Sequence, residues 1–218
     1  GRRHAGPFEH PLQRAQARRF RLEAHPPLPQ KKRDPLAFDQ AKQDIAQLRA
    51  QAEAGEIELA YVDEAGFSQT HPNRSAWTPV GEQHRIPAAR GQRMNVVAAL
   101  LGSGKVFSAK LWCTFTAELF VGFVGLLGKQ ADKPLTIILD NASIHKAKAI
   151  APYLKHLRSQ GVTLYFLPPY SPELNRIEKL WHLMKHTWMA VKHRDAPTLE
   201  ADVAEILDNF GTTYKMVF

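Results

Sequence analysis

The first clear periodicity in the chain is helical. Apolar side chains recur at near-helical spacing at Leu36, Phe38, Ala41, Ile45, Leu48 and Ala52. Asp34 followed by Pro35 has the form of an N-cap and first-turn pair, because the carboxylate can accept from unpaired amides and Pro needs no amide partner there. Gly55 ends the pattern. We therefore predict one helix from Pro35 to Ala54.

From Glu56 the pattern changes to an alternation of period two, which is typical of a β-strand. One face holds Ile57, Leu59, Tyr61 and Asp63, and the other holds Ala60, Val62 and Glu64. We predict a strand that begins at Ile57 and ends at Asp63. Because the alternation puts Asp63 and Glu64 on opposite faces, we expect Glu64 to be a surface or salt-bridge residue.

Turn signals and apolar runs predict the remaining elements. Strands are expected at 75–80, 93–101, 105–112, 135–139 and 162–167, and helices at 116–129, 146–160 and after Pro172. Antiparallel strands followed by alternating helices and strands indicate a mixed sheet with helices on both faces. The order is that of an RNase H-like domain, an α/β fold with a mixed five-stranded sheet flanked by helices, here preceded by a basic N-terminal arm and helix.

Three carboxylates occupy positions where a charge is costly. Asp63 and Asp140 each end an apolar strand, and Glu178 lies at the edge of the apolar stripe of the helix after Pro172. A carboxylate at the end of a buried strand needs compensation, and a shared divalent cation is a common one. In the predicted layout the first strand lies beside the fourth, so Asp63 and Asp140 should converge and Glu178 should lean over them. The pattern indicates a metal-dependent phosphoryl-transfer site.

The chemistry of these ligands favours hard cations. Carboxylate oxygens suit Mg²⁺ or Mn²⁺, and two such ions about 3.5 to 4 Å apart can activate a water or a 3′-hydroxyl and stabilise the leaving oxygen. Zinc is disfavoured because Cys113 is the single cysteine and no His-x-x-x-His pair lies near Asp63 or Asp140 in the sequence.

The positive charge of the chain is concentrated near its N-terminus. The net charge of the 218 residues is +8, and residues 1–50 hold eleven Lys and Arg against five Asp and Glu. Residues 1–33 lack periodicity and predict a basic linker or arm, in which Lys31, Lys32 and Arg33 are candidate contacts to DNA phosphates. A solvated arm without a partner is the alternative.

The composition favours one soluble domain. Apolar residues make up 44% of the chain, which is enough for a core. No apolar run approaches the roughly eighteen residues of a membrane span, and the Arg-rich start does not predict a secretory signal. Since Cys113 cannot form an internal disulfide, we expect an intracellular protein.

Three motifs carry a family resemblance. They are Tyr-Val-Asp-Glu-Ala-Gly-Phe at 61–67, Leu-Asp-Asn-Ala-Ser-Ile-His at 139–145 and Leu-Pro-Pro-Tyr-Ser-Pro-Glu-Leu-Asn-Arg-Ile-Glu at 167–178. In this order they closely resemble the catalytic domain of mariner-like DDE transposases, in the branch carried by bacterial insertion sequences. The resemblance runs from about Asp34 to Trp188. Asp63 and Asp140 are separated by 76 residues, and Asp140 and Glu178 by 37, and this short second gap is similar to the family's.

The resemblance implies a function and a site. Asp63, Asp140 and Glu178 would be the catalytic residues and would bind two Mg²⁺ or Mn²⁺ ions. The expected activity is cleavage of double-stranded DNA at transposon ends and transfer of the 3′-hydroxyl into target DNA, commonly at a TA dinucleotide. A homodimer on DNA is expected, in the cytoplasm of a bacterium and associated with the nucleoid. The candidate substrate contacts are Asn141, His145, Tyr170 and Arg176.

The chain also departs from the family's pattern. Arg176 stands where the family usually has Pro. Family members usually carry helix-turn-helix modules before the catalytic domain, and we expect residues 1–33 to be a remnant of, or a connection to, a missing DNA-binding module. The expected organisation is this arm, a linker helix at 34–55, and an RNase H-like catalytic domain with C-terminal helices at 56–218.

Other interpretations remain open at this point. The chain could be a catalytically inactive or incomplete transposase remnant that binds DNA, or another RNase H-like nuclease that cuts RNA in hybrids. His145 could cap the following helix instead of contacting a phosphate. Trp77 and Tyr170 could brace loops instead of stacking on bases. Trp181 lies on the apolar stripe and is predicted to be core.

Overall fold

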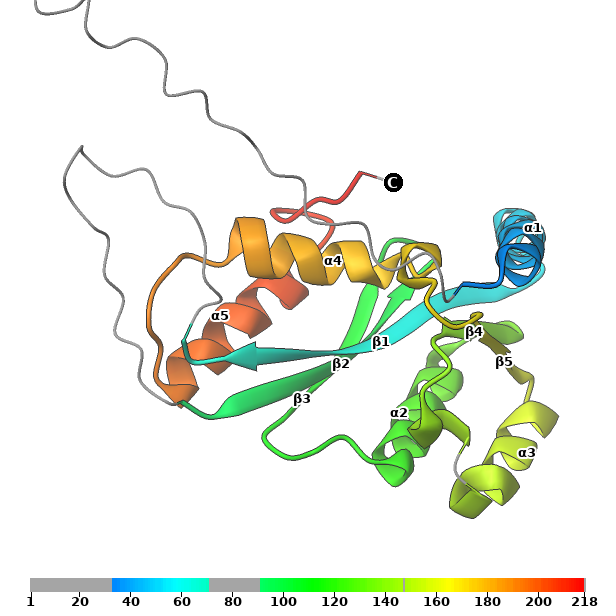
Figure 1. Ribbon diagram of the computed structural model, residues 1–218, viewed down its shortest axis with the longest axis horizontal. Coiled ribbons are helices and arrows are strands. Elements are labelled where there is room, and N and C mark those ends of the chain that lie inside the picture. The colour runs from blue at the N-terminus through cyan, green and yellow to red at the C-terminus, as the bar shows by residue number, and fades with distance from the viewer. Residues whose placement is uncertain (1–32, 71–90, 147, 218) are drawn as a thin grey trace, which may run out of the picture. The chain divides into compact units, whose positions relative to one another are not determined.

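A five-stranded mixed sheet in the order β3-β2-β1-β4-β5 lies at the centre of the fold in the computed structural model, which describes residues 33–70, 91–146 and 148–217 (Figure 1). Its strands are β1 (Glu58–Ser68), β2 (Arg93–Leu101), β3 (Val106–Leu111), β4 (Leu135–Leu139) and β5 (Val162–Phe166). β1, β2 and β3 pair antiparallel, whereas β1, β4 and β5 pair parallel. The predicted RNase H-like mixed sheet is therefore confirmed, with β1 beside β4.

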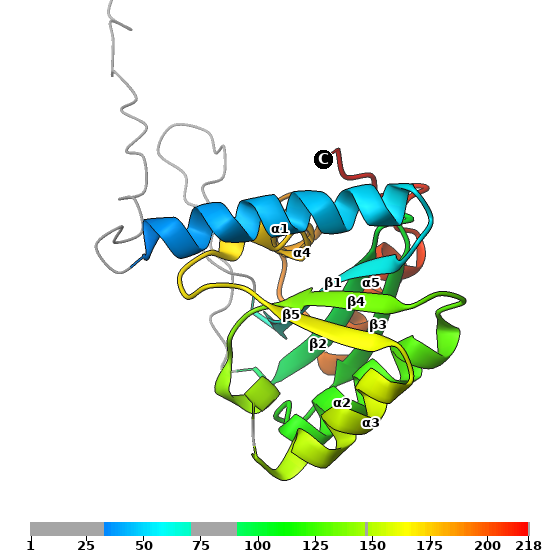
Figure 2. The same ribbon diagram turned by 90° about the vertical axis from the view of Figure 1, so that its right-hand side faces the viewer.

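Helices cover both faces of the sheet (Figure 2). They are α1 (Pro35–Glu53), α2 (Ala117–Gln130), α3 (Ala151–Ser159), α4 (Ile177–Leu183) and α5 (Ala196–Asp208). One core joins α1, α4 and α5 to Leu59 and Tyr61 of β1. The other core joins α2 and α3 to Ala60 and Val62. The alternation predicted for β1 is thus confirmed, with apolar contacts on each side.

The helix predicted from Pro35 to Ala54 is α1, which ends at Glu53. Oδ1 of Asp34 accepts hydrogen bonds from the amides of Leu36 at 3.0 Å and Ala37 at 3.3 Å, as an N-cap should. Gly55 follows the helix with a φ of 76°, a conformation that costs glycine little. Asp34 therefore caps the start of this helix and Gly55 follows its end, as the sequence predicted.

The predicted end of the first strand at Asp63 is wrong. β1 continues to Ser68, because its pairing with β2 extends to the contact between Ser68 and Arg93. The parallel pairing with β4 stops at Tyr61 opposite Ile138. Asp63 therefore lies in the middle of β1, just past the point where its parallel neighbour ends.

One predicted helix is shorter than expected, and another is mixed in type. The helix expected at 146–160 consists of 3-10 segments at Ser143–Lys146 and Lys148–Ile150 followed by α3. Pro152 has no amide hydrogen and its ring conflicts with the preceding turn, so an α-helix could begin only just before it. The helix after Pro172 starts as a 3-10 turn at Pro172–Leu174, continues as α4, and ends in a π-helix at Met184–Trp188.

Some predicted features lie outside the described residues. These are the strand at 75–80 with Trp77, and the arm up to and including Lys31 and Lys32. Within the described ranges, no helix combines the length and apolar character that crossing a bilayer would require.

Candidate active site

Asp63 and Asp140 are brought to one level by the parallel pairing of β1 and β4. Tyr61 is paired with Ile138, and each aspartate lies two residues further along its own strand direction. Helix α4 crosses this end of the sheet and carries Glu178 in its first turn. Asn175, just before α4, donates from Nδ2 to the carbonyl oxygen of Val62 at 3.0 Å. This contact fixes the start of α4 over β1 and directs Glu178 to the same end of the sheet.

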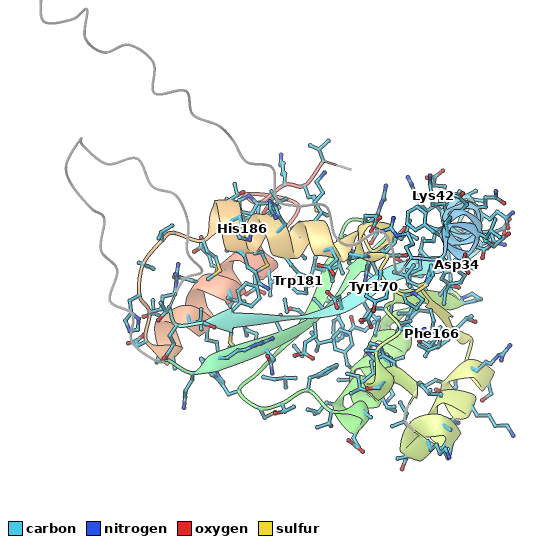
Figure 3. All side chains as sticks on the ribbon, viewed as in Figure 1. Asp34, Lys42, Phe166, Tyr170, Trp181 and His186 are labelled. Atoms are coloured by element: carbon cyan, nitrogen blue, oxygen red, sulfur yellow. The ribbon has the colours of Figure 1, made fainter. Side chains whose placement is uncertain are left out.

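Asp63 is the most perturbed of the three carboxylates. Burial, followed by the negative charge of Glu178 and more weakly that of Asp140, raises its pKa to about 7. Hydrogen bonds from the backbone of Glu64 and from Trp181 oppose the rise. The Trp181 indole Nε1 donates to Oδ2 of Asp63 at 3.1 Å, and Figure 3 shows Trp181 between α4 and β1. The charges that raise the pKa of Asp63 are thus those of two carboxylates, and a bound cation would oppose their effect.

Asp140 has the opposite environment. The hydrogen bond from His145 is the largest cause of a lowered pKa, and the amide of Ala142 contributes at 3.1 Å. His145 Nδ1 lies 3.1 Å from Oδ1 of Asp140. The imidazole is buried and packs against the Phe120 ring with 4.4 Å between centroids. His145 lies in the 3-10 segment before α3, where it holds the Asp140 carboxylate in one orientation.

Glu178 is coupled to a lysine that the sequence analysis did not single out. Burial is the largest cause of the raised pKa of Glu178, the charge of Lys185 lowers it, and that of Asp140 raises it. Lys185 is itself partly buried, which lowers its pKa, while Glu178 and Asp63 act in the opposite direction. Its ammonium lies 5.3 Å from the centroid of the Phe67 ring. Lys185 thus brings a positive charge to the carboxylate group from the π-helical end of α4.

A pocket of about 310 Å³ opens beside these carboxylates. Its lining includes Asp140, Asn141, Asn175 and Glu178, together with residues 167–172. Asn175 is 4% exposed, and its Oδ1 is buried without a hydrogen-bond partner. Since buried acceptors are nearly always paired, this oxygen is suited to accept a hydrogen bond from a ligand or water in the pocket. The sequence analysis missed Asn175, although it lies within the third motif.

Tyr170, labelled in Figure 3, lines this pocket and has a strained backbone conformation. Its φ is 60°, and it is the only non-glycine residue in the described ranges with a positive φ. Its side chain is 56% exposed. Arg33 donates to the Tyr170 carbonyl oxygen from Nε at 3.1 Å and from Nη2 at 2.8 Å, and it pairs with Glu173. Strain of this kind is often found at functional sites, where it fixes a side chain for binding.

Arg176 is separated from the other candidate residues. Its guanidinium lies over the Tyr61 ring, 6.0 Å from the centroid, and it lines a different pocket. The structure therefore brings together Asp63, Asp140, Glu178, Asn141, His145 and Tyr170, and it directs Arg176 elsewhere. Glu64 projects to the opposite face, where it lines a shallow pocket with Arg93 and Asn95.

The donors fit a hard divalent cation in type. All three carboxylates offer oxygen ligands of the kind that Mg²⁺ and Mn²⁺ prefer. Within the ranges that the structure describes, no three His, Cys, Asp or Glu side chains already converge to metal-binding distances. Burial is the largest cause of the raised pKa of Asp63 and of Glu178, and the charge of a neighbouring carboxylate adds to each rise. This repulsion between carboxylates favours their separation. A bound cation would reverse that repulsion.

The strand order of the sheet and the helices on both of its faces define an RNase H-like fold. More specifically, a family model described as DDE superfamily endonuclease matches residues 58–200. The chain belongs to this family.

Sequence relatives come from bacteria. The insertion element IS630 uncharacterized 39 kDa protein of Shigella sonnei is 26% identical over 140 residues, which cover 62% of this chain and 39% of that protein. The uncharacterized protein y4pE/y4sA of Sinorhizobium fredii is 43% identical over 54 residues, which cover 25% of this chain and 36% of that protein. The matches thus span well under half the length of these curated relatives.

Solved structures share the fold. A crystal structure of the Mos1 strand transfer complex matches with a TM-score of 0.58 and 17% identity, over 83% of this chain and 55% of that chain. The catalytic domain of Mos1 mariner transposase matches with a TM-score of 0.55 and 14% identity, over 80% of this chain and 82% of that chain. At these identities the likeness supports the fold.

Proposed function

We propose that the chain is the catalytic domain of a DNA transposase that cuts DNA at transposon ends and joins the 3′-hydroxyl to target DNA. The observation that carries this proposal is that Asp63, Asp140 and Glu178 come from three separate elements to one end of the sheet. The name of the IS630 relative and those of the Mos1 complexes support a transposition reaction.

In this proposal Asp63, Asp140 and Glu178 are the catalytic residues and hold two Mg²⁺ or Mn²⁺ ions. The bound ions would supply an activated water or 3′-hydroxyl and charge stabilisation at the leaving oxygen. Trp181 orients the carboxylate of Asp63 and His145 orients that of Asp140, through the hydrogen bonds that each makes.

Further side chains in or beside the pocket are assigned to DNA binding in this proposal. Asn141 and Tyr170 line the pocket, and Tyr170 exposes an aromatic face beside it. They would contact the DNA strand, and base stacking on such a ring contributes about 1 to 3 kcal/mol per base. Arg33, which contacts the backbone of Tyr170, would bind a DNA phosphate at the same side of the pocket. His145 is less exposed and acts through Asp140.

The partner and setting follow from the same proposal. Double-stranded DNA, as transposon end and as target, is the substrate, and a homodimer on DNA would pair two ends. The bacterial relatives support a bacterial cell, and we propose that the protein is associated with the nucleoid there.

We further propose that residues 1–33 form a DNA-binding arm, 34–55 a linker helix, and 56–218 the catalytic domain. Tyr165 donates to Oδ2 of Asp44 at 2.8 Å, which attaches the linker helix to β5.

The deciding experiment is cleavage of a labelled duplex that carries the terminal repeat of the element. The chain and its Asp140→Asn variant are compared in Mn²⁺ and in EDTA, with Glu64→Gln as the matched control because Glu64 adjoins Asp63 on the opposite face. Nicking by the chain and by Glu64→Gln in Mn²⁺, lost in EDTA and in Asp140→Asn, is the expected result. Equal nicking by Asp140→Asn would sink the assignment of the site.

A second candidate function is an inactive remnant that binds DNA. It is favoured by one observation, namely that His145 Nδ1 lies 3.1 Å from Oδ1 of Asp140, an oxygen that a metal ion would also need. Salt-sensitive DNA binding without cleavage in Mn²⁺ would support it. A duplex of RNA and DNA in the same assay tests the third interpretation, because preferential cutting of its RNA strand would assign a nuclease of hybrids instead.

A further inference from the structure

A second pocket, of about 230 Å³, lies at the start of β1 on the side of the sheet that α1 and α4 cover. It has no lining residue in common with the pocket that contains Asp140 and Glu178. The first turn of α4 separates the two, because Arg176 lines the second pocket whereas Asn175 and Glu178 line the first. A ligand in the second pocket would therefore bind the same turn from its other side.

Tyr61 lies in the wall of this pocket with an unsatisfied hydroxyl. The residue is 2% exposed, and its phenolic oxygen is buried without a hydrogen-bond partner. Leaving a buried polar group unpaired is unfavourable, so each such group requires an explanation. The simplest one is a ligand whose acceptor atom completes the hydrogen bond.

Three cations from three parts of the chain line the pocket together with Tyr61. Arg49 comes from α1, Lys133 from the loop before β4, and Arg176 from the start of α4. The Arg176 guanidinium lies 6.0 Å from the centroid of the Tyr61 ring, and Arg49 lines the same pocket as both residues. In the part of the chain that is described, neither Arg49 nor Lys133 takes part in an ion pair.

The charge of the pocket selects the kind of ligand. Glu53 and Glu58 also line it, so three cations stand against two carboxylates. Arg49 and Arg176 line the same pocket, and an anion between the two guanidiniums would relieve the repulsion of their like charges. Guanidiniums present paired N–H donors that match the oxygens of a phosphate, and a phenol adds a further donor.

We propose that the pocket formed by Tyr61, Arg49, Lys133 and Arg176 binds a phosphate group. The phosphate belongs either to the backbone of a bound DNA, a source that rests on the proposed function, or to free inorganic phosphate. In both cases its oxygen accepts from the Tyr61 hydroxyl and lies between the two guanidiniums. Arg176 is then a phosphate ligand beside the catalytic pocket, and binding there would hold the turn of α4 that carries Glu178.

The test uses the full chain in EDTA, so that cleavage plays no part. Titration calorimetry with inorganic phosphate at constant ionic strength compares the chain with Tyr61→Phe and Arg176→Gln. The matched control is Arg158→Gln, which removes one exposed arginine from α3 on the opposite face of the sheet. We expect saturable binding that weakens about tenfold or more in Tyr61→Phe and Arg176→Gln, because each loses a charge-assisted hydrogen bond. Arg158→Gln should keep the affinity of the unmodified chain.

A second measurement separates the two sources of phosphate. Fluorescence anisotropy of a labelled duplex, also in EDTA, is recorded for the same four proteins with and without inorganic phosphate. Weaker duplex binding by Tyr61→Phe and Arg176→Gln, with competition by phosphate, supports a backbone phosphate. Unchanged duplex binding with weakened phosphate binding supports free phosphate. Thermal melting confirms that Tyr61→Phe is folded.

The proposal is overturned if Tyr61→Phe and Arg176→Gln match the chain in both measurements. That result is distinguishable from a failure of the proposed function, because the cleavage assay in Mn²⁺ is independent of it. Cleavage without phosphate binding would remove this inference alone, whereas phosphate binding without cleavage would leave the pocket and remove the transposase activity.

Discussion

The indole of Trp181 donates a hydrogen bond to the carboxylate of Asp63 across the space between α4 and β1, at 3.1 Å. Trp181 is 3% exposed and packs edge-on against Phe67, with 6.1 Å between ring centroids. A tryptophan that belongs to the core thus also orients a carboxylate of the candidate site. Changes in core packing at α4 are therefore expected to affect metal binding.

Trp181→Phe tests that link. The substitution keeps an aromatic ring but removes the donor that lowers the pKa of Asp63, so the pKa should rise further. Because a proton competes with the metal for the carboxylate, the pH at which Mn²⁺ binding is half-maximal should move upward. Mn²⁺ titrations between pH 6 and 9 measure it. Lower stability with an unmoved pH midpoint would show that Trp181 serves packing alone.

Asp63→Asn should stabilise the metal-free fold at high pH. Since the folded state raises the pKa of Asp63 from 3.8 to about 7, it binds the proton more tightly than the unfolded chain does. Stability from this group is present below about pH 4 and is lost as the pH rises towards 7, on the order of 4 kcal/mol in total. The neutral Asn side chain avoids this loss.

Urea unfolding in EDTA at pH 5 and pH 8 measures the difference. The stability of the chain relative to Asp63→Asn should fall between these two pH values, while Glu64→Gln should follow the chain. Adding Mn²⁺ at pH 8 should stabilise the chain and leave Asp63→Asn nearly unchanged, since binding to the folded state stabilises it. Parallel pH dependences for the chain and Asp63→Asn would contradict the raised pKa.

Most of the architecture around Asp63 could be predicted from the sequence, because residues close together in the chain specify each element. The cap at Asp34, the period-two run before Asp63 and the apolar strand before Asp140 are each specified by neighbouring residues, and the order of elements then put β1 beside β4. The end of β1 was misplaced because its extension depends on pairing with β2, which is distant in sequence.

The roles of individual side chains were harder to predict. Spacing placed Trp181 on the apolar stripe, but it could not show that the indole N–H meets Asp63 across 118 residues of sequence. Asn175 and Lys185 were missed for the same reason, since their importance arises from contacts with β1 and from coupling to Glu178. Pro152, in contrast, was visible in the sequence and should have shortened the predicted helix before α3.

Substitutions at Tyr170 separate backbone strain from the role of its ring. A left-handed conformation costs a non-glycine residue roughly 1 to 2 kcal/mol, so Tyr170→Gly should be about 1 kcal/mol more stable than Tyr170→Ala. Both variants lack the ring and should lose DNA affinity equally, by roughly 1 to 3 kcal/mol if a base stacks on it. Urea unfolding and duplex anisotropy measure the two effects. Full affinity in both variants would assign Tyr170 to bracing the loop.

Arg194 should be the most sensitive position in the segment between α4 and α5. It is 2% exposed, and its guanidinium donates to Oδ2 of Asp202 at 2.6 Å and to the carbonyl oxygens of Lys192 at 3.1 Å and Ala190 at 2.9 Å. Its amide donates to the carbonyl oxygen of Gln69 at 2.9 Å, just past the end of β1. Arg194→Met should lower the free energy of unfolding by about 3 to 5 kcal/mol, because Asp202 and two carbonyls lose a buried partner.

Lys192→Ala is the matched control, because Lys192 pairs with the same Asp202 carboxylate at 3.0 Å but is 48% exposed. An exposed pair contributes about 0 to 1 kcal/mol, so this variant should unfold close to the unmodified chain. Equal losses in Arg194→Met and Lys192→Ala would mean that the charge of Asp202, and not the buried network, holds the segment. A large loss in Arg194→Met alone would show that the buried guanidinium, through Asp202 and the two carbonyl oxygens, holds the segment between α4 and α5 against α5.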